Sequence, residues 1–185
     1  MSEEQGNHSP GELLIEEYFA GHTRAWGLFE DRFGNVRREF VIDSDGEWDG
    51  SHLFLTENFT YSDGERETRV WTFEKTRAGT YTGSADGVVG IATGQAEGNA
   101  LRWEYDFDLP VGDRTWRVRF DDRMLLLDDE VLISKADVNR WGIRIGTVFI
   151  SFHKSTSNAV REATDNVSRP NFGARRTGTG VAAAG

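Results

Sequence analysis

The feature that most constrains this chain is a long series of short β-type segments separated by glycine- or aspartate-bearing turns. Residues 22–154 are rich in Val, Ile, Thr, Phe, Tyr and Trp, and no helical pattern interrupts them. Segments of this kind, joined by turns at a spacing of roughly 8–12 residues, are typical of antiparallel hairpins. We predict ten strands, at residues 22–31, 36–43, 51–61, 67–76, 80–85, 87–94, 100–109, 115–122, 130–139 and 143–154.

Ten consecutive strands without crossover helices predict an all-β, up-and-down antiparallel barrel, because closure removes the exposed sheet edges. One short N-terminal helix is expected at residues 11–21, where Leu14 and Tyr18 share one side and Glu16 lies opposite. A Ser-Pro pair before this segment and a glycine at its end are helix start and stop signals. A helix this short is marginal alone, so we expect it to cap one end of the barrel.

The two ends of the chain differ in composition from the middle. Residues 1–10 are polar, and residues 155–185 carry few large apolar side chains, no periodicity and a slight excess of arginine. Such segments cannot bury enough apolar surface to fold by themselves. We therefore predict a disordered N-terminus at 1–10, a barrel domain at 11–154 and a disordered tail at 155–185.

Charge alternation predicts the register of the hairpin formed by 100–109 and 115–122. With a four-residue loop at 110–113, opposite charges face each other, and a slip by two residues creates a like-charge pair. The predicted pairs are Arg102 with Asp121, Glu104 with Arg119, and Asp106 with Arg117.

The overall charge and the absence of cysteine limit the possible functions. The chain has 31 acidic and 21 basic residues, a formal charge of −10, which disfavours nucleic-acid partners and attachment to anionic lipid headgroups. Without cysteine there are no disulfides, thiolate metal sites or catalytic thiols. No apolar run approaches the ~20 residues of a membrane helix, and no secretory signal precedes the barrel. We expect a cytoplasmic protein without membrane insertion.

No motif for a cofactor, a metal or a known catalytic device stands out. The four histidines are scattered, no GxSxG motif occurs, and no helix follows the glycine-rich stretch at 87–98. Asp121 and Asp122, with the acidic residues at 128–130, lack the spacing of a calcium loop and predict a solvated acidic rim. We therefore predict no cofactor, no metal and no assignable catalytic residue.

Two charged residues fall on faces that are otherwise apolar. Alternation places Glu57 among the apolar residues of its strand, and it places Arg69 beside Trp71 on the next strand. Three interpretations are open. The two residues form a buried ion pair; or Arg69 binds the carboxylate or phosphate of a ligand; or burial raises the pKa of Glu57 for acid–base work.

The inward aromatic side chains either line a cavity or fill the barrel as core. We expect a cavity, since Gly83, Gly90 and Gly94 remove bulk from neighbouring strands. The candidate ligand-binding residues are Glu57, Arg69, Trp71, Trp103, Tyr105 and Trp116.

Several short runs resemble a bacterial family, the domain-of-unknown-function family 3833. They are Arg69-Val70-Trp71, Asp86-Gly87-Val88-Val89-Gly90 and Gly98-Asn99-Ala100, within a resemblance that extends from about residue 14 to residue 154. The resemblance implies a calycin (lipocalin-like) barrel and a bacterial source, and it supplies no catalytic residues. One departure is Arg123, where the family pattern has tryptophan. Association of the family with fatty-acyl modification favours a lipid-like ligand.

Three functions follow from these observations. The first is a carrier that holds a small apolar ligand, such as a fatty-acyl lipid, with Arg69 at its acidic head and Glu57 tuning the contact. The second is a barrel isomerase, cyclase or dehydratase with Glu57 or Asp122 as the acid–base group. The third is a filled barrel that serves as an interaction module, and the oligomeric state stays open in all three.

Overall fold

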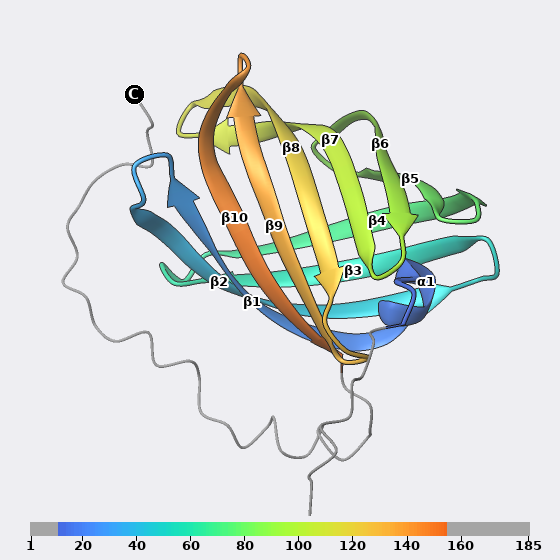
Figure 1. Ribbon diagram of the computed structural model, residues 1–185. Coiled ribbons are helices and arrows are strands. Elements are labelled where there is room, and N and C mark those ends of the chain that lie inside the picture. The colour runs from blue at the N-terminus through green and yellow to red at the C-terminus, as the bar shows by residue number, and fades with distance from the viewer. Residues whose placement is uncertain (1–10, 155–185) are drawn as a thin grey trace, which may run out of the picture.

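The computed structural model describes residues 11–154, which form one short helix and ten strands (Figure 1). The elements are α1 (Ile15–Tyr18), β1 (Gly21–Asp31), β2 (Val36–Trp48), β3 (His52–Tyr61), β4 (Arg66–Arg77), β5 (Thr80–Ala85), β6 (Val88–Glu97), β7 (Ala100–Val111), β8 (Arg114–Leu126), β9 (Val131–Arg140) and β10 (Ile143–Lys154). Every strand pairs with its neighbour in sequence and β1 pairs with β10, so the barrel is closed. The predicted ten-stranded antiparallel barrel is confirmed, whereas the disorder expected at 1–10 and 155–185 lies outside the described residues.

Alternating strand direction sorts the connections to two ends of the barrel. The helix end holds α1 and the turns at 48–52, 77–80, 97–100 and 126–131. The open end holds the turns at 31–36, 61–66, 85–88, 111–114 and 140–143. Figure 1 shows α1 and the tip of the β9–β10 hairpin at opposite ends of the molecule.

The helix is shorter than predicted and buries a residue that was expected on its outer side. It covers only Ile15–Tyr18, because Leu13 is held in an extended segment by a 2.8 Å bond from its N–H to the carbonyl of Gly98. Glu16 is only 6% exposed. The hydroxyl of Tyr81 donates to the Glu16 carboxylate at 2.8 Å, and Lys75 forms an ion pair with it. The amphipathic pattern therefore assigned the wrong face to Glu16.

The predicted register of the β7–β8 hairpin is wrong by two residues. Both strands continue to a two-residue turn at 112–113, so Glu104 lies opposite Asp121 and Asp106 lies opposite Arg119. The opposite charges still meet, but diagonally: Arg119 Nη2 is 2.8 Å from Glu104 Oε2. Strand twist brings such diagonal neighbours within reach of long side chains, so charge complementarity alone does not determine a register.

Two glycines that were expected to open a cavity instead accommodate a tryptophan. A Cβ atom on Gly94 would lie 2.4 Å from Cε3 of Trp103, and one on Gly83 would lie 2.8 Å from Cη2 of the same indole. Real carbon atoms do not approach this closely, so the glycines let Trp103 lie flat against β5 and β6. Gly90, by contrast, faces open space.

Candidate functional site

The barrel is hollow. It encloses a cavity of about 830 Å³, within the range of roughly 300–1,000 Å³ that is usual for small-molecule sites. Ile15, Phe19 and Phe152 line it toward the helix end. Val111 and Ile145 line it toward the open end. The wall is mostly aliphatic and aromatic, so the few polar groups that face the cavity determine what else it can recognise.

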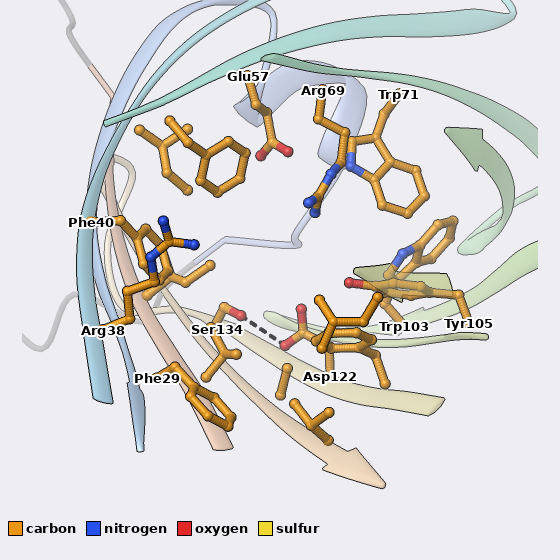
Figure 2. A pocket seen from close by; sticks show the side chains of 18 of the residues that line it. Phe29, Arg38, Phe40, Glu57, Arg69, Trp71, Trp103, Tyr105, Asp122 and Ser134 are labelled. Atoms are coloured by element: carbon orange, nitrogen blue, oxygen red, sulfur yellow. Dashed lines mark hydrogen bonds between the residues drawn. The ribbon is translucent and has the colours of Figure 1, made fainter. Parts of the chain in front are cut away.

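Glu57 and Arg69 both face inward, as the alternation predicted, and they are direct cross-strand partners on β3 and β4. Both side chains point into the cavity from the same wall (Figure 2). Within the described part of the chain, however, the ion pair of Arg69 is with Glu67, at 2.6 Å between Nη2 and Oε1. The buried Nε of Arg69 has no hydrogen-bond partner among these residues. Arg69 thus keeps an unused donor inside the barrel.

Glu57 continues a buried polar row that crosses four strands. Thr23, Ser44, Glu57 and Arg69 are successive cross-strand partners on β1, β2, β3 and β4. Glu57 is 8% exposed, and this burial raises its pKa to about 7, although the charge of Arg69 and the indole of Trp71 partly offset the shift. Glu57 therefore holds its proton in the folded protein up to near-neutral pH.

A second carboxyl group faces the cavity from the opposite wall. Asp122 on β8 is 7% exposed and accepts a 2.8 Å hydrogen bond from Ser134 on β9 (Figure 2). Burial raises its pKa to about 6. The solvated acidic rim predicted for this residue is therefore wrong. The sequence signal that identifies Asp122 as an inward-facing residue is the alternation on β8, which puts it on the same face as Phe120 and Met124.

Three of the predicted aromatic residues line the cavity. Trp71, Trp103 and Tyr105 belong to its wall, and the Tyr105 ring stacks on Phe120 with centroids 4.8 Å apart. The ring of Tyr105 also meets Trp71 edge to face at 5.3 Å. Burial raises the pKa of the Tyr105 hydroxyl, which therefore stays a hydrogen-bond donor at every physiological pH.

Trp116 was expected in the same wall, but it does not line the cavity. It lies near the start of β8, where the extended hairpin carries it toward the open end, and it packs with a small cluster that includes Val118 and Val138. The guanidinium carbon of Arg140 covers its ring, 3.9 Å from the centroid.

Charged residues that the sequence did not single out connect Arg69 to the open end. Arg38 lines the cavity, pairs with Asp63 at 2.9 Å and stacks on Tyr61 with its guanidinium carbon 3.5 Å from the ring centroid. Tyr61 in turn donates to Glu67, the partner of Arg69, at 2.8 Å. This arrangement depends on the register of β2, β3 and β4, which no local pattern in the sequence specifies.

The interior of the cavity therefore combines apolar walls with the Arg69 cation, two carboxyl groups with raised pKa values and a neutral phenol, and further charged residues such as Arg38 line it toward the open end. Within residues 11–154, no group of three His, Asp or Glu side chains could hold a metal ion. In the same residues no helix is long and apolar enough to cross a membrane.

Comparison with solved structures places the barrel among known folds. An S-type phycobiliprotein lyase, CPES from Guillardia theta, superimposes with a TM-score of 0.60 at 9% identity over 78% of this chain and 92% of that one. Rv2717c from M. tuberculosis gives a TM-score of 0.57 at 14% identity over 78% of this chain and 99% of that one. These similarities show a lipocalin-like fold, and they do not by themselves carry a function. No curated protein matches the chain significantly. The model of the protein family of unknown function DUF3833 matches residues 1–154, and the chain belongs to this family.

Proposed function

We propose that the barrel binds a small, largely apolar ligand with an acidic head, such as a fatty-acyl lipid, and acts as a carrier. The observation that carries the proposal is Arg69, a largely buried cation in a mostly apolar cavity of about 830 Å³, with a buried Nε donor that no described residue uses. A guanidinium binds carboxylate or phosphate groups with two parallel hydrogen bonds. An acidic head would satisfy this donor, and the acyl chain would lie along the aromatic wall.

The two buried carboxyl groups fit this ligand only when they are protonated. Ionised Glu57 or Asp122 would repel a ligand carboxylate, whereas the protonated forms can donate hydrogen bonds to it. Their raised pKa values, about 7 and about 6, keep them protonated in mildly acidic solution. Affinity for an acid should therefore fall as the pH rises through 6 and 7.

A titration with a fluorescent polyene fatty acid and the matching fatty alcohol tests the anchor. In the wild-type protein the acid should bind more tightly than the alcohol. Arg69→Ala should weaken acid binding by roughly tenfold to a hundredfold, and it should leave the alcohol almost unchanged. Arg102→Ala, which removes an exposed arginine of the outer face, is the matched control. Equal loss for acid and alcohol would show that Arg69 shapes the cavity without anchoring a head group.

A second candidate function is an isomerase. Glu57 and Asp122 face the same cavity from opposite walls, and each has a pKa near neutrality. The ionised group of such a pair can take a proton from one ligand carbon while the protonated group returns one to another. Loss of turnover in both Glu57→Gln and Asp122→Asn, with ligand affinity retained, would favour the isomerase function over the carrier function.

A further inference from the structure

The turn between β9 and β10 carries an aromatic residue where the backbone disfavours one. Trp141 has a φ of 52°, and it is the sole non-glycine residue with a positive φ between residues 11 and 154. Such a turn position favours Asn, Asp or Gly, because a side chain there crowds the backbone. In the other two-residue turns the residue with a positive φ is a glycine: Gly79, Gly87, Gly98 and Gly112.

Packing does not explain the tryptophan. Trp141 is 84% exposed, so its ring buries little surface in return for the unfavourable backbone conformation. The guanidinium carbon of Arg140 lies 3.9 Å from the Trp141 ring centroid and equally far from that of Trp116. This stack holds a cation beside the exposed indole. A residue in a strained conformation that buries so little of its ring points to a role outside the fold.

The neighbouring hairpin presents the same combination of groups. β1 and β10 are paired, and the N–H of Arg32 donates to the carbonyl of Ile145, so the β1–β2 turn lies beside the start of β10, four residues along the chain from Trp141. Phe33 is 71% exposed, and the guanidinium carbon of Arg32 lies 4.7 Å from its ring centroid. We call the exposed residues of the two hairpins the rim patch: Phe33, Val36, Trp141 and Ile143.

The rim patch is continuous with the mouth of the cavity, since Val36 belongs to both. Charge along the barrel is also uneven. At the helix end, segments 12–17, 47–52, 77–80, 97–100 and 126–131 together hold nine acidic residues and one arginine. Segments 30–39 and 137–144, which form the two hairpins, hold four acidic and five basic residues. Among the described residues, Arg32 and Arg140 have no acidic side chain within ion-pair distance.

From these observations we propose that the rim patch docks on an anionic lipid surface, with the helix end turned away from it. Tryptophan and phenylalanine partition into the interface between headgroups and acyl chains, and arginines beside them bind anionic headgroups. The net charge of −10 opposes such binding at long range, but screening confines this repulsion to within about 10 Å, and the acidic end lies at the far side of the barrel. The proposal holds whatever the cavity binds.

The test is co-sedimentation of the full chain with vesicles of phosphatidylcholine alone or with about 30% phosphatidylglycerol. We expect binding to the anionic vesicles only. Trp141→Asn, which suits the turn and removes the ring, should weaken binding by about tenfold or more. Ile91→Asn introduces the same amide in place of another exposed apolar side chain, 69% exposed on β6, and it should bind like the wild type. The two variants also separate the rim patch from any contribution of the arginines in 155–185.

Three results would overturn the proposal. The first is Trp141→Asn bound as tightly as the wild type, and the second is equal binding to both kinds of vesicle or to neither. The third is a concentration-dependent dimer in sedimentation velocity that Trp141→Asn abolishes, because the rim patch would then be a contact between two copies of the chain. A thermal melt of each variant, with an unchanged or higher midpoint for Trp141→Asn, shows that a loss of binding is not a loss of fold.

Discussion

The two ends of the barrel differ in how their side chains are packed and exposed. At the helix end, Tyr18 donates its hydroxyl to the carbonyls of Glu130 and Phe152, and Phe19 packs edge to face on Phe152 with centroids 5.3 Å apart. At the open end, Phe33 and Trp141 are exposed and the cavity reaches the surface between hairpins. The comparison shows that this barrel is closely packed at one end and leaves apolar side chains exposed at the other.

The largest effect on stability should come from truncating a buried side chain at the helix end. Phe19 is buried and lines the cavity, and its ring packs edge to face on Tyr18 and Phe152. Phe19→Ala should lower the free energy of unfolding in urea by about 3–5 kcal/mol. Phe33→Ala at the open end should change it by less than about 0.5 kcal/mol. Similar losses for both variants would remove the distinction between the ends.

Glu57, between the two ends, should make the protein less stable as the pH rises. Its pKa is raised from 4.5 to about 7 by burial, so the folded state favours the protonated acid. This contribution to stability is complete below pH 4.5 and is lost as the pH rises through 7. Between about pH 5 and about pH 8 the loss should be on the order of 2–3 kcal/mol. Urea unfolding of Glu57→Gln should lack this part of the pH dependence, and an unaltered dependence would contradict the shift.

Glu16 at the helix end should show the opposite sign. Burial opposes its ionisation, but the hydrogen bonds from Lys75 and Tyr81 outweigh it and lower its pKa below 4.5. Its contribution is therefore present above pH 4.5 and is lost in acid. Glu16→Gln should cost about 1–2 kcal/mol at neutral pH, measured by urea unfolding. The adjacent exposed Glu17→Gln is the control, and an equal cost for both would mean that the buried network contributes nothing.

The smallest effect should be a gain in the free energy of unfolding at the open end. Trp141→Asn should raise the free energy of unfolding by about 0.5 kcal/mol, because asparagine tolerates the positive φ better. Trp141→Val, whose branched side chain suits this conformation poorly, should lower it by a similar amount. Thermal melts of the pair measure the difference, and a destabilised Trp141→Asn would show that the ring supports the fold.

Much of the fold could be predicted from the sequence because its determinants are local. Strand alternation and turn glycines predicted ten strands and placed Glu57 and Arg69 on inward faces, where the structure pairs them across β3 and β4. The same alternation on β8 would have placed Asp122 inside, had the run of acidic residues around it not suggested a solvated rim.

The remaining features depend on distances along the barrel that no local pattern encodes. The β7–β8 register followed the shortest turn rather than the best direct charge pairing, since diagonal contacts satisfy the charges equally well. Arg69 pairs with Glu67 rather than Glu57, and Trp116 lies beyond the cavity, because side-chain reach and strand length decide both.

The most direct test of the central claim, that the hollow barrel carries an apolar acid, is native mass spectrometry of the purified full chain. The spectrum should be compared with one of the denatured protein and with an organic extract. The account predicts a stoichiometric adduct that leaves on denaturation, appears in the extract as an acidic lipid, and is depleted in Arg69→Ala. A clean apo mass that persists after incubation with mixed fatty acids would contradict it.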